Sequence, residues 1–288
     1  MKHGLRWLLY PVWIAALIFS PRANAQSQPA APDAAGGTLA ASPVAQTTYR
    51  PAFIQGHKGL SLHKDIYILP LSWAQRYQGN NTELIFQIST KIQLLDMDLY
   101  FGYTQKSYWQ AYNQRVSSPF RETDYNPEFF YRLAPEHLGL LGWGGDIGIE
   151  HQSNGQPEPL SRGWNRVYVA PYYPRGDDLF YFKFWYRIPE PDKRFPLDPN
   201  GDDNPDISDY MGYAELHYRR RIGDDQRLHI MLRGNPETRR GAISISYSIP
   251  SGTQDLFYRF TFFNGFGESL IDYNRSVTRV GVGVAFLR

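Results

Sequence analysis

Apolar and polar residues alternate along most of the chain in short runs, and clusters of Gly, Pro, Asn and Asp separate one run from the next. Successive side chains of a β-strand point to opposite faces, so this period of two favours strands over helices. We count about a dozen runs, near 64–73, 81–93, 95–112, 126–134, 144–153, 164–173, 179–189, 209–221, 226–234, 241–250, 255–267 and 276–287. The pattern predicts an all-β protein, and an even number of strands would let an antiparallel meander close on itself.

The beginning of the chain has a different composition. A basic start is followed by an apolar stretch from Trp7 to Phe19 and by Ala23-Asn24-Ala25, which is typical of a secretory signal peptide over residues 1–25. Residues 26–48 are rich in Ala, Pro and Gln and cannot bury a core, so we expect a disordered leader there. Residues 49–288 remain for one folded domain.

The alternating runs also bear on the membrane. After the signal peptide no stretch approaches the roughly 20 apolar residues of a spanning helix, so a mature chain in a membrane would have to form a closed barrel. Aromatic clusters such as 129–131 and 172–173 fit the girdles of such barrels at the lipid headgroups. A soluble β-sandwich would show similar alternation, but the last run, 276–287, could pair with the first and remove both sheet edges.

Charge and cysteine content narrow the function classes. The chain has no cysteine, so no disulfide contributes to the fold. Cleavage after Ala25 would remove three basic residues and no acidic one, and the formal net charge would fall from +2 to −1. We therefore expect no nucleic-acid partner.

A candidate site lies at one predicted hairpin. In the run 144–153, His151 and Ser153 share a face with Ile147 and Ile149, because these four residues follow one another at intervals of two positions. In the next run, Asn165 shares a face with apolar valines. If the two runs pair through a loop at 154–163, the three polar side chains come within cross-strand reach.

These three residue types fit a serine hydrolase. The Ser153 hydroxyl needs a base to take its proton, His151 can act as that base, and Asn165 can orient the imidazole through its amide oxygen. A neutral orienter suits a site that borders lipid, where a buried carboxylate would cost several kcal/mol. Histidine and serine two apart in a strand are, however, usually ordinary surface or pore residues, so the spacing alone leaves that alternative open.

Five ordered segments carry a more specific similarity. The motif Glu150-His151-Gln152-Ser153-Asn154-Gly155, with residues 103–107, 117–123, 161–168 and 265–274, resembles the outer membrane phospholipase A family. The resemblance runs from about residue 60 to the C-terminus. It implies a twelve-stranded antiparallel transmembrane β-barrel in the outer membrane of a Gram-negative bacterium. It also implies hydrolysis of the acyl esters of phospholipids and lysophospholipids, of both A1 and A2 type.

The resemblance assigns roles to individual residues. His151 would be the base, Ser153 the nucleophile, Asn165 the orienter, and the backbone N–H of Gly155 an oxyanion donor. Active members of the family are calcium-dependent homodimers. The implied Ca²⁺ ligands are the backbone oxygen of Gln156 and the hydroxyl of Ser161 from one subunit, Ser117 from the other, and Asp203 in the monomer.

Some of these assignments have simpler alternatives. Pro157 restricts Gln156 to extended conformations, which could change the calcium affinity, and the acidic stretch 202–206 is equally a loop of turn-forming residues. The resemblance suggests that Gln105 supports the dimer from inside the barrel, where a buried amide would satisfy interior hydrogen bonds. We expect Trp109 and Tyr125 to be aromatic residues of the membrane interface.

Two other functions remain possible at this stage. The first is a non-catalytic outer-membrane barrel, either a pore or a structural protein, in which His151 and Ser153 are incidental. The second is an esterase that modifies lipopolysaccharide, which shares the chemistry and differs in its substrate.

Overall fold

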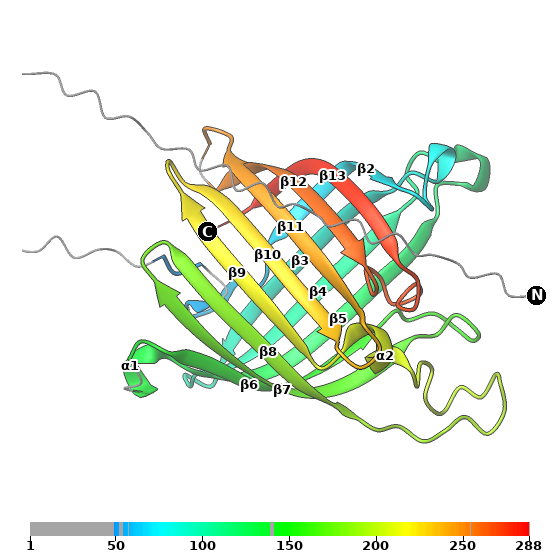
Figure 1. Ribbon diagram of the computed structural model, residues 1–288, viewed down its shortest axis with the longest axis horizontal. Coiled ribbons are helices and arrows are strands. Elements are labelled where there is room, and N and C mark those ends of the chain that lie inside the picture. The colour runs from blue at the N-terminus through cyan, green and yellow to red at the C-terminus, as the bar shows by residue number, and fades with distance from the viewer. Residues whose placement is uncertain (1–48, 52–53, 57, 139–140, 254, 288) are drawn as a thin grey trace, which may run out of the picture. The chain divides into compact units, whose positions relative to one another are not determined.

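The structure is a computed structural model that describes residues 49–51, 54–56, 58–138, 141–253 and 255–287. The predicted signal peptide and leader, 1–25 and 26–48, lie outside these residues. The described residues form one antiparallel sheet of 13 strands (Figure 1). The strands are Leu60–Leu62 (β1), Ile66–Ala74 (β2), Leu84–Leu94 (β3), Leu99–Trp109 (β4), Phe120–Leu133 (β5), Gly144–Ser153 (β6), Gly163–Arg175 (β7), Asp178–Ile188 (β8), Ala214–Ile222 (β9), Gln226–Asn235 (β10), Arg240–Pro250 (β11), Leu256–Gly265 (β12) and Val277–Phe286 (β13).

The sheet closes into a barrel. Each strand from β3 to β12 pairs with its neighbours in sequence, and β13 pairs with both β12 and β2. The short β1 and the longer β2 lie along the same partner, because β1 pairs with Thr90–Ile92 and β2 with Ile85–Gln87 of β3. Together they fill one position, so the barrel has twelve strands around its circumference.

The predicted runs all coincide with strands, but three boundaries differ by four residues or more. The run 95–112 began too early, because Leu95 and Asp96 form a turn with φ of 55° and 49° before β4 begins. The run 126–134 began too late, since β5 already starts at Phe120. The run 209–221 included part of a short helix, α2 (Ile207–Met211), that precedes β9.

The two faces of the barrel wall differ in chemistry. Large apolar side chains point outward and are exposed, among them Phe129, Ile147, Ile149, Val167, Val169, Tyr186, Phe260 and Val282. Charged residues point inward and pair: Arg132 holds Asp146 with two hydrogen bonds of 2.7 and 2.8 Å, and Glu150 contacts Arg166 at 3.1 Å and Lys183 at 2.9 Å. A soluble sandwich would bury its apolar face, whereas this wall presents it outward, as a barrel in lipid does. In the described part of the chain no helix is long and apolar enough to cross a membrane.

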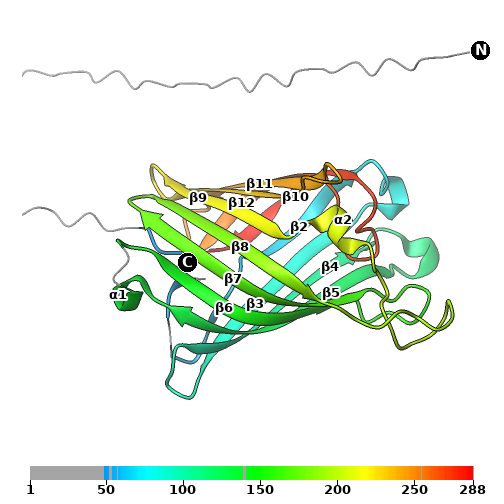
Figure 2. The ribbon, with the colours of Figure 1, turned by 60° about the horizontal axis from the view of Figure 1, so that its bottom comes forward.

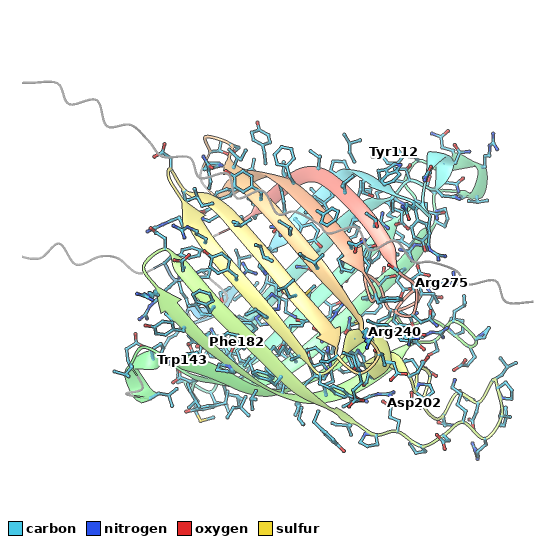
Figure 3. The ribbon with its side chains drawn as sticks, in the orientation of Figure 1. Tyr112, Trp143, Phe182, Asp202, Arg240 and Arg275 are labelled. Atoms are coloured by element: carbon cyan, nitrogen blue, oxygen red, sulfur yellow. The ribbon has the colours of Figure 1, made fainter. Side chains whose placement is uncertain are left out.

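The two ends of the barrel are also different. One end carries the long connections after β2, β4, β6, β8 and β12, and the connection after β8 extends furthest from the wall in both ribbon views (Figures 1 and 2). The opposite end has shorter turns and the helix α1 (Pro135–Leu138). Asp202, Arg240 and Arg275 lie at the first end and Trp143 at the second (Figure 3).

The first end is filled by the chain itself. Residues of α2 and of the connection between β12 and β13 pack on inward aromatic residues of the wall. Members of this cluster include Trp164, Tyr168, Trp185, Met211, Leu270 and Tyr273. Backbone N–H groups of the connection are also held from the wall, as Ile271 N donates to Glu122 at 2.9 Å and Leu270 N to Asp124 at 3.2 Å. This packing supports the strands that carry the candidate site.

Candidate active site

The hairpin predicted from the sequence is present as β6 and β7. Their register places His151 directly opposite Asn165 and Ser153 directly opposite Gly163. Ile147 and Ile149 of the same strand face are 53% and 55% exposed, so this face is the outer wall. The expectation that His151, Ser153 and Asn165 share an apolar, outward face is confirmed.

The inward neighbours fix the hairpin from behind. The side-chain oxygen of Gln152 accepts hydrogen bonds from Trp164 Nε1 at 3.1 Å and from Arg166 at 3.2 Å, and Asn126 donates to the backbone oxygen of His151 at 2.8 Å. Trp164 is fully buried. These contacts give the outward residues of β6 and β7 a rigid support, which a precise catalytic geometry needs.

The imidazole is held from one side by the amide. His151 Nδ1 and Asn165 Oδ1 are 2.9 Å apart, and because an amide oxygen can only accept, Nδ1 carries the proton. The other ring nitrogen, Nε2, is then free to accept a proton. Ser153 lies two residues along the same face, and a Cβ built on Gly163 would lie 3.5 Å from Ser153 Cβ and 3.9 Å from His151 Cε1. A glycine therefore lies opposite the serine and leaves open the space beside both side chains.

The loop after Ser153 is organised by Asn154, which the sequence analysis did not single out. This side chain is 3% exposed. Its Oδ1 accepts from the backbone N–H of Arg162 at 2.9 Å and of Gln156 at 3.3 Å, and its Nδ2 donates to the backbone oxygen of Leu160 at 2.9 Å. The sequence signal that could have identified it is Asn154-Gly155 directly after a strand, because Asn in a turn commonly bonds to nearby backbone groups.

Gly155, the predicted oxyanion donor, follows directly. It adopts φ of 63°, in the left-handed region that favours glycine, and a Cβ there would lie 3.2 Å from the ring of Tyr125. Tyr125 is itself the cross-strand neighbour of Ser153 and is outward-facing, as expected for an interface aromatic. Gly155 thus lies at the serine end of the hairpin.

Two predicted calcium ligands, Ser161 and Asp203, lie together, and a lysine contacts the carboxylate. Ser161 Oγ donates to Asp203 Oδ2 at 2.5 Å. The other oxygen of Asp203 is 2.6 Å from the ammonium of Lys193, which also contacts the carboxylate of Glu158. Burial works to raise the pKa of Asp203, but the hydrogen bonds from Lys193 and Ser161 outweigh it and hold this pKa below its usual value. Neither Lys193 nor Glu158 was predicted, because their meeting depends on how the long 189–206 connection folds back.

The other three predicted site residues are Gln156, Ser117 and Gln105. Gln156 lies in the loop after β6, where its N–H donates to Asn154. Ser117 ends the 3₁₀ helix Gln114–Val116 between β4 and β5, with φ of 61°, and is exposed. Gln105 was expected inside the barrel, and that expectation was wrong. It alternates with buried Thr104 and pairs across the sheet with Tyr125, so it lies on the outer face, where Tyr103 donates to its Oε1 at 3.0 Å.

A hollow of about 560 Å³ opens over these residues. Its walls include His151, Ser153, Gly155, Ser161, Asn165 and Asp203 from the predicted set, together with Glu190 from the 189–206 connection. Three residues of the predicted set, Ser117, Gln105 and Gln156, are not among the described residues that line it. The hollow thus brings together a serine hydroxyl, a histidine whose ring is held by an amide and a nearby backbone N–H, which are the groups that acyl transfer requires.

The chain is similar to proteins of known classification. The profile of the family described as Phospholipase A1 matches residues 44–286. The chain is 33% identical over 293 residues to Phospholipase A1 of Escherichia coli K12, covering 96% of each, and 37% identical over 266 residues to a putative phospholipase A1 of Neisseria meningitidis, covering 81% of this chain and 66% of that one.

Solved structures agree with the sequence comparisons. The outer membrane phospholipase A of Escherichia coli superposes with a TM-score of 0.69 at 33% identity, over 79% of this chain and 98% of that one. The outer membrane phospholipase of Salmonella typhi, a dimer with bound calcium, gives a TM-score of 0.69 at 32% identity, over 82% and 95%.

Proposed function

The chain belongs to the phospholipase A1 family, and we propose that it cleaves phospholipid acyl esters with Ser153, His151 and Asn165. As a member, it is an ester hydrolase and a twelve-stranded β-barrel of a Gram-negative outer membrane. We extend the proposed activity to both acyl positions and to lysophospholipids. The observation that carries the proposal is the 2.9 Å contact of His151 Nδ1 with Asn165 Oδ1 on the outward wall, two residues from Ser153.

The proposed reaction follows from the proton positions. Ser153 Oγ attacks the ester carbonyl carbon while His151 Nε2 takes its proton, and the imidazolium that forms keeps its Nδ1–H on Asn165. The developing oxyanion faces the backbone N–H of Gly155, and such a donor typically contributes ~10²–10³ in rate. His151 then returns the proton to the departing alcohol. A water molecule hydrolyses the acyl-serine by the same route, with His151 again as base.

Calcium fits the oxygen donors near this centre. Ser161, Asp203 and the backbone oxygen of Gln156 are hard donors of the kind that Ca²⁺ prefers, and the ammonium of Lys193 between Asp203 and Glu158 marks the place as a cation site. When bound, the ion would supply positive charge beside the oxyanion. Its binding to Asp203 requires Lys193 to leave, and Pro157 limits how Gln156 can turn its carbonyl.

The remaining assignments concern a dimer. We place the partner subunit's Ser117 as a further calcium ligand, since this residue is exposed and outside the hollow of its own chain. Gln105 supports the dimer from the outer wall, because an amide that faces lipid gains by bonding to an identical amide across an interface. Both placements would make activity depend on association, which protects the host membrane from a permanently active lipase.

The alternative, a pore or a structural barrel, has less support. The inward face holds buried ion pairs such as Arg132 with Asp146 and Glu150 with Lys183, and these occupy the space that a conducting channel would need.

The test uses purified, refolded protein in detergent with phospholipids labelled in one acyl chain or the other. We expect calcium-dependent release of both labels, lost in Ser153→Ala and kept in Ser251→Ala, a control at the opposite end of the barrel. Release that persists in a folded Ser153→Ala variant would reject the assignment of the nucleophile. Equal inactivity of the folded wild type would favour the structural alternative.

A further inference from the structure

The amide of Asn165 is held at both of its ends. Its Oδ1 lies 2.9 Å from His151 Nδ1, and its Nδ2 donates to Glu190 Oε1, also at 2.9 Å. An ionised carboxylate has no hydrogen to donate and can only accept. The NH₂ group of Asn165 must therefore face Glu190, and its oxygen must face the imidazole. The orientation of the Asn165 amide is therefore set by its contact with Glu190.

This orientation decides which nitrogen of the imidazole is the base. With the amide oxygen toward it, Nδ1 carries the proton and Nε2 can accept one from Ser153. With the amide reversed, its NH₂ would donate to Nδ1 and favour the tautomer protonated on Nε2, which cannot take the serine proton. The wrong tautomer in a serine triad can cost about 10⁴ in rate, so a residue that prevents reversal of the amide affects the chemistry without touching the substrate.

The backbone delivers Glu190 to this place. Ile188, the last residue of β8, pairs directly with Asn165 of β7, and Glu190 two residues later continues on the same side. Pro191 restricts the backbone of Glu190 to extended conformations. The backbone oxygen of Pro191 also accepts from the N–H of Asp202 at 2.8 Å, which ties the beginning of the 189–206 connection to its end.

We propose that Glu190 is a positioning residue, which acts through Asn165 to keep His151 in the tautomer that can accept the serine proton. The inference rests on the proposed triad. It also adds a charge to the site. The residue that contacts the imidazole, Asn165, is neutral, and the negative charge of Glu190 lies one hydrogen bond further away.

The test compares Glu190→Ala with Glu190→Gln and with Asp192→Ala, which removes a carboxylate from the same connection. Two quantities are measured: kcat and KM on a soluble ester, and the rate at which a long-chain sulfonyl fluoride labels Ser153. We expect Glu190→Ala to lower kcat and the labelling rate by about 10- to 100-fold, the usual loss when a partner orients a directly acting group, with KM nearly unchanged. Glu190→Gln keeps an acceptor and should recover most of the rate, and Asp192→Ala should match the wild type.

A double-mutant cycle separates positioning from general support of the loop. In an Asn165→Ala background, Glu190→Ala should have no further effect on kcat or labelling. The inference is overturned if Glu190→Ala matches Asp192→Ala, if Glu190→Gln is as slow as Glu190→Ala, or if the two losses multiply in the double variant. A folded Ser153→Ala variant that retains activity would reject the triad itself, whereas an inactive Ser153→Ala beside a fully active Glu190→Ala would reject only the role of Glu190.

Discussion

Replacing Lys193 by methionine should tighten calcium binding. The ammonium lies 2.6 Å from Asp203 and also contacts Glu158, so it occupies oxygens that the ion needs. Methionine keeps most of the length of the side chain and removes the charge. The variant therefore removes an internal competitor and leaves the other predicted ligands in place.

The magnitude follows from the two contacts that calcium must replace. The three side chains are only 15–18% exposed, but they lie on two connections at the end of the barrel, the loop after β6 and the one after β8. Ion pairs at such a surface contribute about 0.2–1 kcal/mol each. Together the two pairs contribute about 1 kcal/mol, which corresponds to a ~5-fold lower Kd for calcium in Lys193→Met.

The assay is a calcium titration of the refolded protein in detergent, by calorimetry or by displacement of luminescent terbium. Arg194→Met is the matched control, because Arg194 pairs with Asp198 rather than with the cation site and its removal changes the net charge by the same amount. Circular dichroism confirms that both variants are folded. Equal Kd values for Lys193→Met and Arg194→Met would refute the competition and leave only a general charge effect.

Three further predictions concern the surroundings of Ser153 and the interior of the barrel. Gly163→Ala should fold and keep its labelling rate within a few-fold, since the added Cβ meets its neighbours at 3.5 Å or more, whereas Gly163→Leu should fill the space beside Ser153 and slow labelling by more than about 10-fold; equal rates would show that this space is not used. Asn154→Ala removes the bonds that close the 154–162 loop, each contributing about 0.5–1.5 kcal/mol, so the urea midpoint should fall and kcat with it, and an unchanged kcat would separate the loop from the reaction. Arg132→Met leaves Asp146 buried without its partner and should cost about 3–5 kcal/mol in urea unfolding, most of it recovered by adding Asp146→Leu; a single variant as stable as the wild type would contradict this account of the interior.

The barrel could be predicted from the sequence because each wall residue faces either outward or into the interior, and the two sides require different side chains. In β6, where Ile147 and Ile149 alternate with inward Asp146 and Glu150, the predicted run matched the strand at both ends. The method failed at β5, whose first half carries the inward acids Glu122 and Asp124. Those side chains accept hydrogen bonds from backbone N–H groups of the distant 266–276 connection, and the alternation of nearby residues does not predict such contacts.

The site could be predicted from the sequence as far as it depends on the same alternation. The pleat placed His151, Ser153 and Asn165 on one face, and the same parity applied to β4 would have put Gln105 outside, since Thr104 beside it is inward. Glu190 has the parity of Ile188, but it lies beyond the end of β8, so strand alternation alone could not place its carboxylate on Asn165. The only sign of it in the sequence is the proline on each side of Glu190, because these prolines restrict the backbone there.

The outward opening of the hollow has a consequence for kinetics. A site that faces the lumen or bulk water samples its substrate by volume concentration, whereas Ser153 lies on the wall that meets the surrounding amphiphiles. The relevant variable is then the surface mole fraction of phospholipid. Adding inert detergent at a fixed amount of phospholipid should slow turnover by dilution in two dimensions, even though the bulk concentration of substrate has not changed.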